Sequence, residues 1–131
     1  MNIGLVAYDS KKKLMQNFCI AYQGIFRKHQ LYATATTGQS IENITTLKIH
    51  KFLSGHLGGQ QQLGALIEQN ELDLLIIFRD PMAPKKHETD TKGITRLCDV
   101  YNIPMATNIA TAEALILALD RGDLDWREMY K

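Results

Sequence analysis

Short runs of apolar residues alternate along this chain with longer segments whose apolar residues recur every three or four positions. Such alternation is typical of βαβ units, in which helices connect the parallel strands of one sheet. The runs with strand character lie at residues 3–7, 31–33, 49–53, 72–78 and 104–106. The sequence therefore predicts an α/β fold with three layers, α/β/α, around a central parallel sheet of about five strands.

Helices are predicted between these strands. Their apolar positions include Leu14, Phe18, Tyr22, Ile25 and Phe26; Leu63, Leu66 and Ile67 within 60–69; Ile94, Leu97, Cys98 and Tyr101; and Leu115, Ile116 and Leu119. A brief helix is expected from about Ser40 to Thr46. Residues 72–78 are apolar without interruption, so we expect them to form the middle of the sheet. The tail, 121–131, is apolar enough to dock on its own body or on a neighbouring subunit.

The length and composition limit the function classes. A chain of 131 residues, 45% of them hydrophobic, is the size of one compact domain spanning 1–131. Its 15 Lys and Arg nearly balance its 14 Asp and Glu, so neither nucleic acid nor an anionic membrane is an expected partner. No apolar stretch reaches the roughly 18 residues of a membrane span, and we expect a cytoplasmic protein. Cys19 and Cys98 lack the spacing of a zinc site or a secreted disulfide framework.

Two polar turns follow strand runs and precede helical segments. They are Thr34-Ala35-Thr36-Thr37-Gly38 and Ser54-Gly55-His56-Leu57-Gly58-Gly59. Hydroxyl groups and backbone N–H groups at a helix N-terminus bind anions, phosphate above all. Taken alone, the threonines would more often be ordinary strand and cap residues.

Parallel strands place their carboxyl ends at one rim of the sheet, where ligands bind. Tyr8, Asp9 and Lys12 follow the first strand run, and Asp80, His87 and Asp90 follow the fourth. Lys12 lies one helical turn from the rim and can direct its ammonium group back at a phosphate. The simpler interpretations are a helix cap for Asp9, a solvated lysine for Lys12 and a surface histidine for His87.

These segments resemble the methylglyoxal synthase family in order and spacing over nearly the whole chain. The matching segments are Leu5-Val6-Ala7, Asp9 with Lys12, Thr34–Gly38, Ser54-Gly55 with Gly58-Gly59, Asp80-Pro81, His87 with Asp90, and Ala106-Thr107-Asn108. The resemblance implies a lyase that converts dihydroxyacetone phosphate to methylglyoxal and inorganic phosphate without a cofactor. It also implies a homohexamer, with inorganic phosphate as product and possible inhibitor.

The resemblance implies a role for each matching residue. The phosphate-binding positions would be Tyr8, Lys12, Thr34, Ala35, Thr36, Thr37, Ser54 and Gly55. His87 would hydrogen-bond the substrate carbonyl, and Asp90 would orient His87. Asp9 and Asp80 would belong to the polar catalytic site.

Several positions depart from the family pattern. Family members usually have the catalytic aspartate where this chain has Gln60, and a histidine where it has Tyr8. Ala35 replaces a glycine, and it does not easily adopt a positive φ; His56 replaces a proline. A neutral amide is not a general base, and loss of a positioned base costs about 10²–10⁴ in rate. The sequence therefore predicts substrate binding with poor turnover.

Three alternatives stay open. The chain is an active lyase in which Asp80 or Asp90 has taken over as base. Otherwise it is a non-catalytic phosphate-binding or phosphometabolite-binding regulatory module that has lost the base. The third alternative is an inactive engineered form, with Gln60 introduced in place of an acid to trap a ligand.

Overall fold

The computed structural model of this protein describes residues 1–54, 58–83 and 91–130. Its sheet has five strands, all parallel, in the order β3-β2-β1-β4-β5. The strands are β1 (Asn2–Ala7), β2 (Gln30–Ala33), β3 (Ile49–Lys51), β4 (Leu74–Phe78) and β5 (Met105–Ala106). This confirms the predicted α/β fold with a central parallel sheet.

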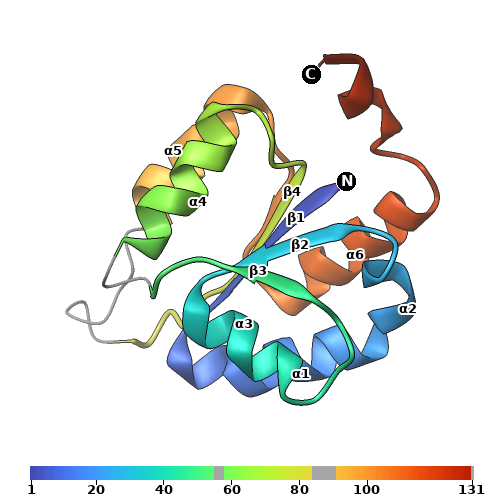
Figure 1. The fold of residues 1–131 in the computed structure, drawn as a ribbon. Helices are drawn as coiled ribbons and strands as arrows, with labels where there is room; N and C mark the ends of the chain where they lie inside the picture. The colour runs from blue at the N-terminus through green and yellow to red at the C-terminus, as the bar shows by residue number, and fades with distance from the viewer. Residues whose placement is uncertain (55–57, 84–90, 131) are drawn as a thin grey trace.

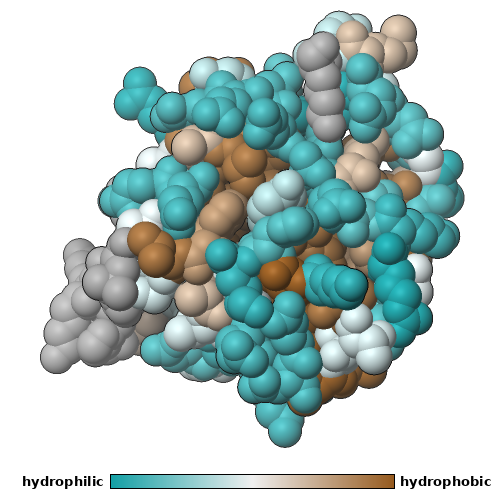
Figure 2. Space-filling model, in the orientation of Figure 1, coloured by the Kyte–Doolittle hydropathy of each residue, from teal (hydrophilic) through white to brown (hydrophobic). Residues whose placement is uncertain are grey.

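Helices cover both faces of the sheet (Figure 1). They are α1 (Lys12–Ala21), α2 (Gln23–Phe26), α3 (Ala35–Glu42), α4 (Gly59–Glu68), α5 (Thr91–Tyr101) and α6 (Ile109–Asp120), with 3₁₀ turns η1 (Asp9–Lys11) and η4 (Asp125–Tyr130). Helices α4 and α5 lie on one face, and α1, α3 and α6 lie on the other (Figure 1). Hydrophilic residues cover most of the side shown in Figure 2, with hydrophobic residues in smaller patches between them. Within the described ranges, no helix is long and apolar enough to cross a membrane.

The core consists of two hydrophobic clusters, one on each face of the sheet. Successive side chains of a strand point to opposite faces. Thus Ala7 of β1 packs with the α1 and α6 cluster, whereas Val6 packs with the α4 and α5 cluster. In β4, Phe78 belongs to the first cluster and Ile77 to the second. Tyr8, which follows Ala7, continues this alternation and packs with the α4 and α5 cluster.

The position of residues 72–78 differs from the prediction. The middle strand is β1, and β4 lies between β1 and β5. Both strands are buried along almost their whole length, so hydropathy alone does not indicate which of them is the middle strand. Strand order depends on which face each connecting helix covers, and the apolar runs do not encode it.

The helix that was expected from about Ser40 to Thr46 is also displaced. It begins at Ala35, directly after the second strand, and ends at Glu42. Threonine and glycine are weak helix formers, which is why the pattern indicated a later start. Burial of Thr37 and Ile41 against the sheet outweighs this propensity.

The strand order places a topological switch point between β1 and β4. The chain leaves β1 toward α1 and β2, and it leaves β4 toward α5 and β5, on the opposite face. The two strands are paired up to their last residues, Ala7 and Phe78. In doubly wound sheets, ligands bind in the crevice at the carboxyl ends of such neighbouring strands.

Candidate functional site

A cluster of hydrogen bonds surrounds the Thr37 hydroxyl at the carboxyl end of β1. Thr37 is fully buried, and its Oγ1 accepts from the Ala7 amide and from Lys12 Nζ, each at 3.2 Å. The Thr34 hydroxyl lies 3.3 Å from the same oxygen. Lys12 Nζ also donates to the Ala7 carbonyl. The structure thus brings one ammonium and two threonine hydroxyls together at the predicted rim.

The first turn of α3 adds backbone donors to this cluster. Thr34 is the N-cap residue in extended conformation, but its side chain does not cap the helix. The Ala35 amide donates to the Leu53 carbonyl at 3.4 Å, and the first helical bond runs from Gly38 to Thr34. The amides of Thr36 and Thr37 therefore come from the turn whose N–H groups lack helical acceptors. Ala35 has an ordinary helical backbone, so its replacement of glycine needs no positive φ.

Lys12 is held in a partly desolvated position. Its side chain is 21% exposed, and burial lowers the pKa of its ammonium group, opposed by Asp9. The Asp9 carboxylate lies 3.8 Å from Lys12 Nζ but is itself fully exposed. Such an exposed pair contributes little stabilisation. A phosphate would therefore supply the stronger counter-charge for Lys12.

In the second turn, residues 53 and 54 lie close to the N-terminus of α4, and glycines at positions 58 and 59 permit this approach. Gly58 has φ 106°, and the Gly59 amide donates to the Ser54 carbonyl at 2.9 Å. A Cβ at Gly59 would lie 2.0 Å from the Leu53 carbonyl oxygen. The Leu53 amide in turn donates to Gln62 Oε1 at 2.7 Å. Gln62 therefore helps to hold this turn in place.

Asp80 is held on the rim by neighbours from two segments. Its carboxylate accepts from the Ser10 hydroxyl at 2.6 Å and from the Met82 amide at 2.9 Å. The Ser10 hydrogen bond and then the Met82 amide lower the pKa of this carboxyl group. Ser10 was not among the predicted site residues, although its place after the first strand run marks it as a rim residue. Both Asp80 oxygens are therefore engaged, and its basicity is reduced.

Gln60 lies in the first turn of α4, apart from the Lys12 cluster. Its side chain is 9% exposed, and the buried Oε1 has no hydrogen-bond partner. Within the described ranges, no hydrogen bond links it to Lys12, Thr34 or Thr37. It borders a hollow of about 470 Å³ between α4 and α5. Tyr8 packs against the α4 and α5 cluster as well, so these two departures from the family pattern share one side of the sheet.

The remaining predicted residues divide into two groups. Thr36 is exposed in the first turn of α3, and Ser54 is partly buried beside the start of α4. Gly55, His87 and Asp90 lie outside the described residues, as does His56. In the described part of the chain, no group of His, Cys, Asp and Glu side chains could hold a metal ion.

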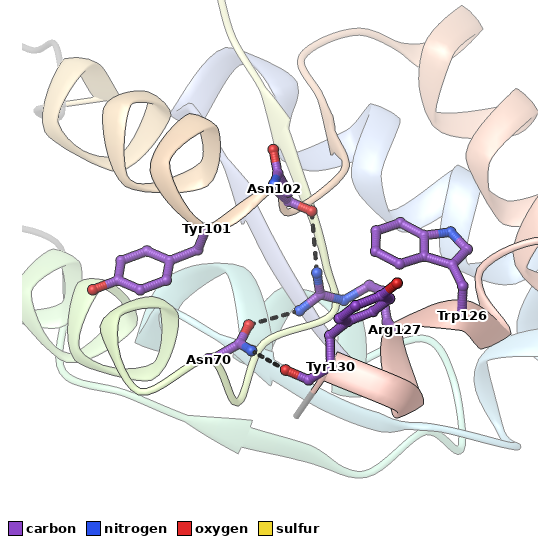
Figure 3. Close-up of a pocket in the computed structure, with 6 residues that line it drawn as sticks. All are labelled: Asn70, Tyr101, Asn102, Trp126, Arg127 and Tyr130. Atoms are coloured by element: carbon purple, nitrogen blue, oxygen red, sulfur yellow. Dashed lines mark hydrogen bonds between the residues drawn. The ribbon is translucent and has the colours of Figure 1, made fainter.

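A separate pocket lies near the amino ends of the strands (Figure 3). It has a volume of about 350 Å³ and is lined by Asn70, Tyr101, Asn102, Trp126, Arg127 and Tyr130. Arg127 is 3% exposed and donates to Asp73, Asn70, Leu72 and Asn102, so its guanidinium is already occupied. These bonds attach the tail to its own body, which is one of the two expected docking modes. The pocket is at the other end of the sheet from the Lys12 cluster.

The fold and the rim define a doubly wound α/β protein with hydroxyl, amide and ammonium donors at its switch point. A family model described as "MGS-like domain" matches residues 15–107. The methylglyoxal synthase of Caldicellulosiruptor saccharolyticus is 59% identical over 98% of this chain and 92% of its own length. That of Clostridioides difficile is 54% identical over 100% and 96%, respectively.

A solved structure agrees with the sequence matches. The crystal structure of methylglyoxal synthase from Elizabethkingia anophelis NUHP1 superimposes with a TM-score of 0.84 and 43% identity, covering 88% of this chain and 76% of that chain. This chain belongs to the methylglyoxal synthase family, an enzyme family whose substrate is a small molecule that contains phosphate.

Proposed function

We propose that this chain binds dihydroxyacetone phosphate at the rim between β1 and β4 and converts it slowly to methylglyoxal and inorganic phosphate. The observation that carries the proposal is the convergence of Lys12, Thr34 and Thr37 at the switch point, at the carboxyl end of β1. The phosphate would lie against Lys12, the two hydroxyls and the α3 amides. Thr36, Ala35, Ser54 and Gly55 would complete the cradle, and Tyr8 would border it.

The reaction sets clear demands on the other half of the site. A base removes a proton alpha to the carbonyl, and the electron pair forms an enediolate that hydrogen-bond donors must stabilise. The C–O bond to phosphate then breaks, phosphate leaves, and the resulting enol rearranges to methylglyoxal. His87, oriented by Asp90, would donate to the substrate oxygen on which charge develops.

Slow turnover follows from the groups available as base. Gln60 occupies the position of the family's catalytic aspartate, and its side-chain amide is not a base. Asp80 accepts from Ser10 and Met82, and these donors lower its pKa, which makes it a weaker base. The Asp9 carboxylate is fully exposed. Asp90 lies outside the described residues and is the one predicted carboxylate left for this role.

A regulatory module that binds a phosphometabolite without turnover is the second candidate. The unpartnered Gln60 oxygen favours it, because a buried neutral amide can recognise a ligand but cannot take its proton. In either case, we propose a cytoplasmic homohexamer without a cofactor. If the chain is an enzyme, inorganic phosphate would be its product and an inhibitor. Native mass spectrometry tests the oligomer, and phosphate titration tests the inhibition.

Steady-state release of methylglyoxal tests the proposal directly. The assay compares the unaltered chain with Gln60→Asp, and Gln61→Asp serves as control because it adds the same charge one residue further along. We expect Gln60→Asp to raise kcat by about 10²–10⁴ and Gln61→Asp to leave it unchanged. Equal rates for the unaltered chain and Gln60→Asp would mean that the base lies elsewhere. Binding without turnover in the unaltered chain would exclude the slow enzyme and leave the regulatory module or an inactive engineered form.

A further inference from the structure

The pocket near the amino ends of the strands has aromatic walls (Figure 3). Tyr101 ends α5, and Trp126 and Tyr130 belong to η4. These three residues are 36% to 72% exposed, and none of them is part of either hydrophobic cluster of the core. Apolar surface that gathers in an exposed hollow is typical of binding sites. The three rings therefore indicate a ligand with a flat face on which they can stack.

The pocket also contains the buried guanidinium group of Arg127. Four hydrogen bonds to oxygen acceptors hold this group in place, and one of the acceptors is the carboxylate of Asp73, which neutralises its charge. Among the six described residues that line the pocket, Arg127 is the only charged one. A phosphate, carboxylate or ammonium ligand would find no free counter-charge there. The pocket thus favours an uncharged ligand, and the guanidinium plane offers it another stacking surface.

Asn102 supplies a polar edge to the pocket. Its φ of 53° is a conformation that asparagine tolerates, and its carbonyl accepts from Arg127 at 3.1 Å. Its side-chain amide has no hydrogen-bond partner among the described residues. Asn70 differs, because its amide accepts from Arg127 and donates to the Tyr130 carbonyl. One amide, with a donor and an acceptor side by side, is therefore left for a ligand, and asparagine binds N6 and N7 of adenine in this way.

The size of the pocket limits the ligand further. Its volume of about 350 Å³ is near the lower end of the range of about 300–1,000 Å³ for small-molecule sites. We infer that this pocket is a second ligand site, which binds a flat, uncharged nitrogen heterocycle of the purine type against the aromatic rings, with the Asn102 amide at its edge. This site goes beyond the proposed function and is independent of it, because no residue of the Lys12 cluster takes part.

NMR titration of the full chain tests the inference with two matched ligands, adenine and purine, which differ only in the 6-amino group. Trp126 is the only tryptophan in the chain, so its indole N–H gives a single signal that reports on the pocket. We expect adenine to shift this signal and that of the Asn102 side-chain amide, with a Kd on the order of 10⁻⁴–10⁻³ M for about ten non-hydrogen atoms. Purine should bind roughly 3- to 10-fold more weakly, because it lacks one hydrogen-bond donor.

Three variants separate the hydrogen bond from the stacking. Asn102→Gly tolerates the positive φ and keeps the carbonyl that holds Arg127. It should remove the advantage of adenine and leave purine binding within about twofold. Tyr101→Ala removes one wall and should weaken both ligands by about 5- to 100-fold, the range for loss of a stacked ring. Val100→Ala is the matched control, since Val100 is an exposed neighbour in α5 that does not line the pocket, and it should change neither affinity.

Several results would overturn the inference. One is an unshifted Trp126 signal with both ligands in the unaltered chain, and another is equal affinity for adenine and purine, which needs no folded variant. Adenine shifts confined to the amides of Thr36 and Thr37 would place the heterocycle at the rim instead. A Trp126 signal that changes with protein concentration and not with adenine would show that a second copy covers the pocket. Glycerol 3-phosphate, added to the same samples, tests the proposed function separately, because it should shift the amides at the rim and leave Trp126 unchanged.

Discussion

The Lys12 ammonium group is half-buried among oxygen acceptors, with a lowered pKa because burial disfavours its charged form. A bound phosphate would favour that charged form and raise the pKa again. Affinity for phosphate should therefore be highest while Lys12 is protonated and should fall as pH rises through the lowered pKa, below the ordinary 10.5. The pH dependence of phosphate affinity should therefore report the titration of Lys12.

Titration calorimetry with a phosphomonoester, glycerol 3-phosphate, from about pH 8 upward checks this, since a phosphomonoester, with a second pKa of about 6, keeps its charge in that range. Lys12→Met should bind roughly 10- to 100-fold more weakly, as expected for the loss of a charged hydrogen bond, and its affinity should not change with pH. Lys13→Met removes an exposed neighbouring charge and should retain the fall. A pH-independent affinity in the unaltered chain would exclude Lys12 as the phosphate ligand.

Among the site residues, the sequence predicted those that follow strands, because rim position depends on strand ends alone. Lys12, Thr34 and Thr37 are examples, and the structure brings them within hydrogen-bond reach. The roles of Gln62 and Arg127 were not predictable. Each depends on where a long side chain ends, at the Leu53 amide and at Asp73 respectively, and no local pattern encodes such contacts.

At the scale of elements, the close approach of residues 53–54 to the start of α4 shapes the second turn. Gly59 permits this approach, since a Cβ there would lie 2.0 Å from a backbone oxygen that cannot rotate away. We expect Gly59→Ala to destabilise the fold by about 1–3 kcal/mol or more, as overpacking does, and to weaken phosphate binding by displacing Ser54.

Chemical denaturation and phosphate titration of Gly59→Ala measure these effects. Gly24→Ala is the matched control, because a Cβ at Gly24 in α2 meets nothing within 4 Å. That variant should be neutral or stabilising by up to about 1 kcal/mol, as expected for alanine in a helix. Equal stability of the two variants would show that the turn has room to relax.

The elements themselves were largely predictable, and the exceptions have a common cause. Short apolar runs identified all five strands, and the period of about 3.6 residues identified α4, α5 and α6. The predicted start of α3 and the predicted central place of residues 72–78 were wrong, because both depend on packing between segments that are distant in sequence. Local sequence patterns indicate whether a segment is a helix or a strand. Tertiary packing determines where the element begins and ends and where it lies in the sheet.

For the whole molecule, the buried ion pair of Arg127 with Asp73 and the proposed ligand site lie at opposite ends of the sheet. Arg127 Nε donates to the fully buried Asp73 at 3.2 Å, and Asp73 also accepts from the Asn2 amide at 2.8 Å. Removing one partner of a buried ion pair costs about 3–5 kcal/mol. Arg127→Met should therefore lower the free energy of unfolding by this amount while phosphate affinity stays the same.

Thermal unfolding with and without phosphate measures both quantities in one series. Arg121 also pairs with an aspartate, Asp123, but both side chains are largely exposed, so Arg121→Gln should change stability by less than about 0.5 kcal/mol. A loss of phosphate affinity in folded Arg127→Met would contradict the separation of the two ends.

The most direct test of the central claim is a ³¹P NMR time course of dihydroxyacetone phosphate with stoichiometric unaltered protein. One series of spectra reports both binding, as a shift of the ester signal, and elimination, as growth of inorganic phosphate. The account predicts an immediate shift followed by phosphate release about 10²–10⁴ slower than with Gln60→Asp. An unshifted ester signal would contradict phosphate binding by the proposed cradle. Phosphate release as fast as with Gln60→Asp would contradict the claim that the chain lacks its catalytic base.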